Sequence, residues 1–265
     1  GNVMPELGKL DIEPARSSIR NLFLAHIVRA KGMDSLSRKL AGPLIPTPAA
    51  VLAGGRLLSR EMDQLLMVDI GGATTDVYSY GAEEVPAGMM RKGLEPPRDM
   101  RTVEADIGMR YSLSSLVEQA GLDSIIAQAP DQELWRRELE QIMAVPGRLV
   151  CPELEELETV LAHQAVVISV TRHAGSVERI YSPTGFVDVL KGKDLRGIKT
   201  VVGIGGVLAN SLQPDKILAI EPKGLLPENP KLMLDRDYVM AAAGLLAETR
   251  PDLAAKLLAN SLASI

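Results

Sequence analysis

Apolar residues recur at intervals of three and four near the start of the chain. This spacing predicts an amphipathic helix from Pro14 to Lys31, with the proline suited to the first turn and Gly32 to the end. A proline-rich connector follows at 41–48. Thr47 can then cap a second helix that runs toward Arg60.

The pattern changes at residue 65. The segment 65–70, LLMVDI, is almost continuously apolar, as expected of a strand buried on both faces. The segment 75–80, TDVYSY, is rich in β-branched and aromatic residues. Because only four residues separate the two, a β-hairpin is predicted.

Helical spacing returns between about residues 110 and 174. Three stretches carry it, at 113–120, 131–144 and 153–173. The run AVVISV at 165–170 also suits a strand. We favour a helix there, because the periodic stretch around it is too long for one strand. His173 is expected to end that helix, where a charged imidazole favours the helix dipole.

The last third of the chain alternates strands and helices. Strands are predicted near 177–181 and at 199–204, followed by a short helix, the apolar segment 217–220 and a loop from Pro222 to Pro230.

Two helices are predicted for the end of the chain. Asp237 can cap a helix from Tyr238 to Glu248, and Pro251 can begin another that runs to the end. The whole pattern is that of an α/β protein with an α-rich insertion.

Composition excludes several classes of protein. The net charge of −5 argues against nonspecific nucleic-acid binding, and one Trp, five Tyr and two Phe offer little for base stacking. The single Cys151 excludes an internal disulfide framework and a cysteine-cluster zinc site. No apolar run is long enough to cross a membrane and no secretory signal opens the chain, so we expect a soluble cytoplasmic protein. The chain begins at Gly1 and soon enters helix-like sequence, which suggests a piece of a longer protein.

The turn of the predicted hairpin carries the strongest chemical signal. Two glycines free the backbone N–H groups to wrap a phosphate, hydroxyls follow, and a carboxylate at the end of a buried strand can hold Mg²⁺ through its waters. The alternative is a tight turn, where Gly, Thr and Asp are common in any case. The residues concerned are Asp69, Gly71, Gly72, Thr74, Thr75 and Asp76.

A second glycine-rich segment follows the strand at 199–204. Gly203, Gly205 and Gly206 would let a flat ligand approach the backbone. The segment is neither a dinucleotide fingerprint nor a Walker loop, because Leu208 stands at the third glycine position and no Gly-Lys-Ser/Thr follows. An ordinary strand-to-helix turn is the alternative.

Together the two motifs resemble a known superfamily. DIGGATTDV is similar to the second phosphate-binding hairpin of the actin, Hsp70 and sugar-kinase superfamily, and VVGIGGVLAN to its adenosine-binding segment. This resemblance implies an actin-like ATPase (ribonuclease H-like) lobe with a helical insertion. The implied organisation is connecting helices at 1–62, a nucleotide-binding α/β lobe at 63–111 and 176–265, and an insertion subdomain at 112–175.

A narrower resemblance covers residues 46–247. The segments at 46–55, 101–112, 171–175, 192–210 and 237–247 resemble the glutamate-mutase-associated MutL-type proteins, a reactivating-factor-like group. The resemblance implies an ATP-binding chaperone or reactivating factor for an adenosylcobalamin-dependent mutase of the glutamate mutase type, with mutase subunits as partners. A small-molecule kinase or a hydantoinase-type ATPase is the alternative, with Asp76 and Asp106 as nominal bases. Whether the protein forms a homodimer stays open.

By resemblance, the residues of the hairpin turn would contact the phosphates of ATP or ADP, with Asp69 as the Mg²⁺ ligand. The glycines at 203, 205 and 206 would face adenosine. Glu104, Asp106 and Gly108 lie where the superfamily often places a third nucleotide-facing segment, although a strand end leading into a helix explains them equally well. The superfamily's first Asp-x-Gly-x-Thr hairpin has no counterpart before residue 69. This chain therefore resembles the second lobe, and hydrolysis would need the first.

Overall fold

The computed structural model describes residues 3–6, 11, 12, 14, 15, 18, 19, 22, 45–81, 85, 86, 88–148, 154–183 and 185–265. The chain divides into two compact units, Gly1–Ala50 and Val51–Ile265, which we consider separately. Most of the helix predicted for 14–31 lies outside the described residues, as does Cys151; the described positions 14, 15, 18, 19 and 22 are helical.

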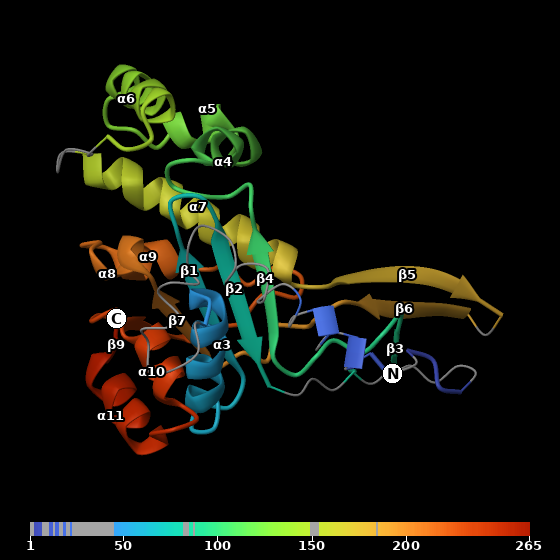
Figure 1. Ribbon diagram of the computed structural model, residues 1–265. Coiled ribbons are helices and arrows are strands. Elements are labelled where there is room, and N and C mark those ends of the chain that lie inside the picture. Colours follow the sequence, from blue (N-terminus) through green and yellow to red (C-terminus); the bar gives the residue numbers. More distant parts are fainter. Residues whose placement is uncertain are drawn as a thin grey trace. The chain divides into compact units, whose positions relative to one another are not determined.

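The second unit alternates helices and strands, as the sequence predicts for an α/β protein (Figure 1). The helices are α3 (Thr47–Leu58, which begins in the first unit), α4 (Leu113–Ala120), α5 (Leu122–Ile126), α6 (Gln132–Ala144), α7 (Glu155–His173), α8 (Gly206–Ala209), α9 (Pro214–Leu218), α10 (Met240–Leu246) and α11 (Pro251–Ser261). The strands are β1 (Leu65–Ile70), β2 (Thr75–Tyr80), β3 (Met89–Arg91), β4 (Met100–Glu104), β5 (Ser176–Ser182), β6 (Gly185–Lys191), β7 (Thr200–Ile204), β8 (Lys231–Asp235) and β9 (Leu262–Ser264).

Six strands form one mixed sheet in the order β4-β2-β1-β7-β8-β9. Strands β1, β7 and β8 are parallel, whereas β2 is antiparallel to β1 and pairs Thr75 with Ile70. The predicted hairpin is therefore confirmed. Because the carboxyl ends of β1, β7 and β8 lie at the same edge, residues that follow these strands are neighbours in space.

The sheet is covered on both faces, which explains the continuous apolar run of β1. Leu66, Val68 and Ile70 pack in the cluster that includes the insertion helices. Leu65 and Met67 pack on the other face with α3, α10 and α11. A strand between two apolar layers has no face on which polar residues are favoured.

The insertion between β4 and β5 consists of α4 to α7; the three predicted helical stretches correspond to α4, α6 and α7, and α5 was not predicted. Helix α7 includes residues 165–170, so the helical interpretation of AVVISV is confirmed. It packs against β1 and β2, α4 packs against it, and α5 and α6 follow in turn from α4 (Figure 1). Among the helices that the structure describes, none has both the length and the apolar character needed to cross a membrane.

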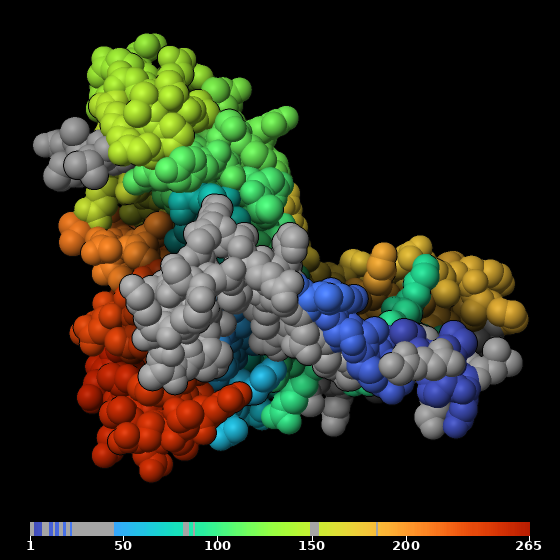
Figure 2. Space-filling view, in the orientation of Figure 1, coloured from blue at the N-terminus to red at the C-terminus, as the bar shows by residue number. Residues whose placement is uncertain are grey.

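A separate three-stranded sheet has the order β3-β6-β5. Strands β5 and β6 project from the six-stranded sheet in Figure 1, and part of their surface is visible in gold in Figure 2. Of these strands only β5 was anticipated by the sequence pattern, because β6 carries two glycine-flanked ends and no strict alternation.

The C-terminal region corrects three expectations. Helix α10 begins at Met240, and the carboxylate that accepts from its first N–H groups belongs to Asp235, not to Asp237. Asp235 ends a strand, β8, that was not predicted. Helix α11 ends at Ser261, and the last residues form β9 in place of a continued helix.

His173 ends α7 as predicted, but it does not act through a positive charge. The side chain is 1% exposed, with Nδ1 2.8 Å from the Thr102 hydroxyl and Nε2 2.8 Å from the Ser79 hydroxyl. Burial and the nearby charge of Lys193 lower the pKa of His173 to about 3. A neutral imidazole therefore fastens α7 to β2 and β4 through hydrogen bonds.

This arrangement predicts acid sensitivity. Below pH 6.5 the unfolded chain protonates this imidazole while the folded chain resists protonation to about pH 3, so stability falls as the pH falls through that window. The slope due to one group reaches at most about 1.4 kcal/mol per pH unit. Urea unfolding of the wild type and His173→Gln between pH 7 and 4.5 measures it. The variant should be less stable at pH 7 but lose less on acidification; parallel curves would contradict the assignment.

Candidate functional site

The two predicted glycine motifs meet at one edge of the sheet. Asp69 is the second-to-last residue of β1 and pairs in register with Ile204 of β7. Gly205 follows β7 with a φ of +95°, and a Cβ added there would lie 2.3 Å from Asp69 Oδ1. The parallel pairing of β1 and β7 thus places the carboxylate of one motif against the backbone of the other.

The other two glycines of the second motif differ in setting. Gly203 is buried within β7, and an added Cβ would meet the side chains of Leu208 and Leu218 in the core. Gly206 begins α8 and is exposed, with only the amide of Asn210 near an added Cβ. Gly205 and Gly206 therefore lie at the edge of the sheet beside Asp69. At Gly203 the space for a side chain is filled by core residues.

The hairpin turn 71–74 is held from one side by the segment 109–112. Carbonyl oxygens of three consecutive turn residues accept hydrogen bonds from that segment. The donors are the N–H of Met109 to Gly71 (3.0 Å), the N–H groups of Arg110 and Tyr111 to Gly72 (2.8 Å each) and the Ser112 hydroxyl to Ala73 (2.7 Å).

This hydrogen bonding fixes the direction of the turn's amide groups. In a trans peptide the N–H of one residue points opposite to the carbonyl of the residue before it. The N–H groups of Gly72, Ala73 and Thr74 therefore point away from segment 109–112. Successive N–H groups aimed to one side form a concave site for an anion.

Gly108 allows this close approach. A Cβ at Gly108 would lie 2.5 Å from the carbonyl carbon of Ala73, so a side chain there would push the segment away from the turn. Thr75 reinforces the contact, because its buried hydroxyl donates to the carbonyl of Ile107 over 3.0 Å. The Thr75 hydroxyl is thus engaged inside the protein, whereas the side chain of Thr74 is half-buried, 3.5 Å from Asp76.

Asp76 faces Asp69 across the hairpin and is bound by an arginine. Arg101 of β4 places Nε 2.7 Å and Nη2 2.6 Å from Oδ1 of Asp76, which is 8% exposed. The guanidinium also lies 5.9 Å from the centre of the Tyr78 ring. Arg101 therefore compensates the charge of one of the two hairpin carboxylates.

The second carboxylate is in a less favourable environment for charge. Burial, together with the charges of Asp76 and Asp235, which outweigh the opposing charge of Arg101, raises the pKa of Asp69 to about 6. The side-chain oxygens of Asp69 accept no hydrogen bond from the residues that the structure describes. A carboxylate with raised pKa at the mouth of a strand is a group that a cation would stabilise.

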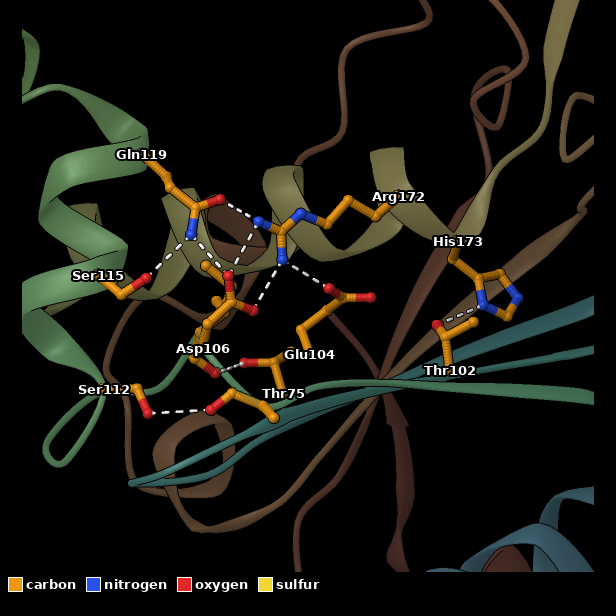
Figure 3. A network of polar contacts seen from close by, with 11 residues as sticks. Thr75, Thr102, Glu104, Asp106, Ser112, Ser115, Gln119, Arg172 and His173 are labelled. Carbon is orange, nitrogen blue, oxygen red and sulfur yellow. Dashed lines mark hydrogen bonds and ion pairs between the residues drawn. The ribbon is translucent and has the colours of Figure 1, made fainter.

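Glu104 and Asp106 form a separate network (Figure 3). Arg172 of α7 places Nη1 2.6 Å from Glu104 Oε2 and 2.8 Å from Asp106 Oδ1, and it also donates to Gln119 of α4. Hydrogen bonds from Arg172 and Gln119 lower the pKa of Asp106 to about 2. These acids tie the end of β4 to two helices of the insertion, which favours a connecting role.

Two residues near Asp69 had not been singled out. Asp235 is fully buried and accepts from the Ser261 hydroxyl at 2.5 Å as well as from the start of α10. Tyr238 has a φ of +56° and is 59% exposed; burial and the charges of Asp69 and Asp235 raise its pKa. In the sequence, Asp235 closes the segment KLMLD much as Asp69 follows LLMV within β1, but this short segment was not recognised as a strand. Tyr238 had no such signal, because its strain is visible only in the backbone.

Gly205 offers a test of the contact between the motifs. Gly205→Ala should destabilise the protein by on the order of 1–3 kcal/mol more than Gly93→Ala. Gly93 also has a positive φ, +87°, but nothing lies within 4 Å of an added Cβ, so both variants place a side chain at positive φ and only Gly205→Ala adds the clash with Asp69. Thermal unfolding measures the difference, and equal losses would refute the contact.

Asp69 offers a second test, with a sign that depends on pH. The folded state keeps this proton to about pH 6, whereas the unfolded chain releases it near 3.8, so ionisation of Asp69 costs stability as the pH rises through that window. Asp69→Asn should therefore stabilise the protein at pH 7.5 by on the order of 1–3 kcal/mol, and less at pH 4.5.

Asp76→Asn serves as the contrast, because loss of the ion pair with Arg101 should destabilise. Chemical unfolding at pH 7.5 and 4.5 measures the change in the free energy of unfolding for both variants. A destabilising Asp69→Asn at pH 7.5 would show that this carboxylate is stabilised by the fold.

Comparison with known proteins agrees with the resemblance seen in the sequence. The family described as MutL protein matches residues 1–262. A curated relative, Protein MutL of Clostridium tetanomorphum, is 39% identical over 280 aligned positions, which include the whole of this chain and 60% of the length of that protein. The chain thus spans about three-fifths of this relative, and over that length it belongs to the MutL protein family.

Proposed function

We propose that the edge formed by the two glycine motifs binds ATP and ADP. The observation that carries this proposal is the orientation of the turn 71–74, whose carbonyls are held by segment 109–112 so that its amides face the other way. A phosphate group is the anion that such a cradle suits, since several N–H groups can donate to its oxygens at once.

The neighbouring Gly205 and Gly206 would accept the rest of the nucleotide. Neither carries a side chain, and Gly205 touches Asp69, so a ligand on the turn would continue over this backbone. Tyr238 provides an exposed aromatic surface at the same edge. Burial raises the pKa of Tyr238, and the residue is close enough to Asp69 that the charge of Asp69 raises it further. We infer that the adenosine part lies on this side of Asp69.

Mg²⁺ would be held by Asp69 together with water and phosphate oxygens. Among the described residues no group of three His, Cys, Asp or Glu side chains is arranged to hold a metal ion. One carboxylate fits the preference of Mg²⁺ for few protein ligands. The raised pKa of Asp69 beside two other acids supports this role, because a divalent cation would relieve the repulsion among them.

The fold gives further support for an actin-like, ribonuclease H-like lobe. A β-hairpin leads into parallel strands reached through helical connections, with the glycine turns on one edge of the sheet. In the superfamily that the sequence resembles, hydrolysis needs groups from a second lobe. We therefore propose that this chain binds nucleotide and that turnover requires a first lobe in addition to it.

We further propose that the protein is a reactivating factor for an adenosylcobalamin-dependent mutase of the glutamate mutase type. Membership in the MutL family supports this role. Its physical basis would be a population shift, in which ATP and ADP favour different conformations and the mutase subunits bind these unequally. The release of damaged cobalamin would accompany the cycle.

The kinase alternative is weakened by the state of its nominal bases. Asp106 is bonded to Arg172 with its pKa near 2, and Asp76 is paired with Arg101. A carboxyl group with a pKa as low as that of Asp106 is a poor proton acceptor at neutral pH, and the ion pair with Arg101 occupies the carboxylate of Asp76.

The nucleotide proposal predicts a Mg²⁺-dependent affinity that Asp69 mediates. Calorimetry of the wild type should show ATP binding that strengthens in Mg²⁺ relative to EDTA. Asp69→Ala should lose that gain, roughly tenfold, and leave the EDTA value nearly unchanged. Asp63→Ala, an exposed acid before the other end of β1, is the matched control. If calorimetry of the full-length protein detects no heat of ATP binding, the proposed nucleotide site is wrong.

The partner proposal is tested separately. Immobilised full-length protein should retain purified mutase subunits in one nucleotide state and release them in the other, and Asp69→Ala should lose this dependence. If the mutase subunits are retained equally in both nucleotide states while ATP still binds, the reactivating role is wrong and the nucleotide site stands.

A further inference from the structure

Within the part of the chain that the structure describes, β5 forms one edge of the three-stranded sheet. Strand β5 pairs with β6 over all seven of its residues, and no other strand of the described chain lies on its far side. Residues 176–181 are all exposed. An exposed strand edge presents unpaired N–H and C=O groups and is a template for pairing with another strand.

The register identifies the groups that face outward. Ser182 pairs with Gly185 across a two-residue connection, and such flanking residues form a hydrogen-bonded pair. Hydrogen-bonded and non-hydrogen-bonded pairs alternate along an antiparallel ladder. Val177, Arg179 and Tyr181 therefore direct their backbone groups away from β6, toward the free edge.

The usual protections of an edge are weak here. There is no proline in 176–182, and the pairing with β6 is continuous, without a bulge. Both charges are compensated within the sheet. Arg179 donates to both oxygens of Asp188 (2.7 and 3.0 Å), and Lys92 lies 3.7 Å from Glu178.

We propose that β5 pairs with β5 of a second copy of this chain, antiparallel about a twofold axis at Arg179. In an antiparallel pair, opposed residues point to the same face of the sheet. A twofold axis perpendicular to the sheet keeps each residue on the same face in both copies. The numbers of two opposed residues must therefore be both odd or both even. The register centred on Arg179 is the one in which all seven residues find partners. It forms about six new backbone hydrogen bonds, through residues 177, 179 and 181 of each copy.

The side chains suit this register. Val177 stands opposite Tyr181 of the second copy, and Ser176 opposite Ser182, while Arg179 meets its equivalent with each charge already paired to Asp188. Tyr181 packs edge-on against Phe186 in its own copy, with ring centroids 5.4 Å apart. Val177, Tyr181 and Phe186 are 41%, 77% and 73% exposed and share one face, so the pairing places Val177 of each copy against the Tyr181–Phe186 pair of the other.

The pairing also explains how a small projecting sheet is stabilised. Two- and three-stranded sheets are marginal unless an apolar face is covered. Two copies form a six-stranded sheet in which the remaining edges are the three-residue β3 strands. A second copy of the chain supplies an edge of matching length, charge balance and polarity.

The first test is the oligomeric state, because the proposal requires a dimer that the β5 edge holds together. Sedimentation across roughly a hundredfold range of concentration should show a monomer–dimer equilibrium. Val177→Pro removes an outward N–H without touching the β5–β6 ladder and should weaken the dimer at least tenfold. Val177→Thr keeps the N–H and a β-branched side chain and should dimerise like the wild type. A monomer at all concentrations, or a dimer that tolerates Val177→Pro, overturns the proposal.

The second test reads the register. In a Cys151→Ser background, Arg179→Cys should form an intermolecular disulfide under mild oxidation, because its equivalent lies directly opposite. Glu178→Cys should not, because in this register it faces Ile180, and its own equivalent is more than about 7 Å away. Circular dichroism confirms that both variants fold. Equal cross-linking of both, or of Glu178→Cys alone, rules out the proposed register.

Discussion

The parallel pairing of β1 with β7 is the constraint on which the candidate site depends. A parallel pair needs a long crossover, and this chain places β2, the small sheet and the whole helical insertion between the two strands. The pairing puts Asp69 beside Ile204, so the turns that follow both strands share one edge. Without it, the two glycine motifs would be isolated turns.

The insertion is coupled to that edge through polar contacts. Segment 109–112 holds the carbonyls of the turn and leads directly into α4, while Arg110 pairs with Glu158 of α7 at 2.5 Å. Arg172 and His173 fasten the far end of α7 to β4 and β2. A change at the turn would therefore act on α4 and α7. This is the physical link that a nucleotide-driven change of conformation would need.

Local patterns in the sequence were sufficient for much of the fold. The hairpin was predictable because its apolar strand and four-residue turn are contiguous, and α7 because its periodicity extends over many turns. Strands β6 and β8 were not predicted, because neither shows a strict alternation of apolar and polar residues. The cap of α10 was assigned to Asp237 because that acid is nearer to the helix, whereas the carboxylate that accepts is Asp235.

The sequence by itself determined the two glycine motifs, the acids beside them, and the family resemblance, because these depend on residue identity and order alone. Only the tertiary structure decided what each polar group does. It buried His173 in a neutral state, paired Asp76 with Arg101, bound Asp106 to Arg172 and left Asp69 with a raised pKa. The reason is physical: a side chain's charge state depends on burial and on neighbours far away in the sequence. The fold alone brings those neighbours together.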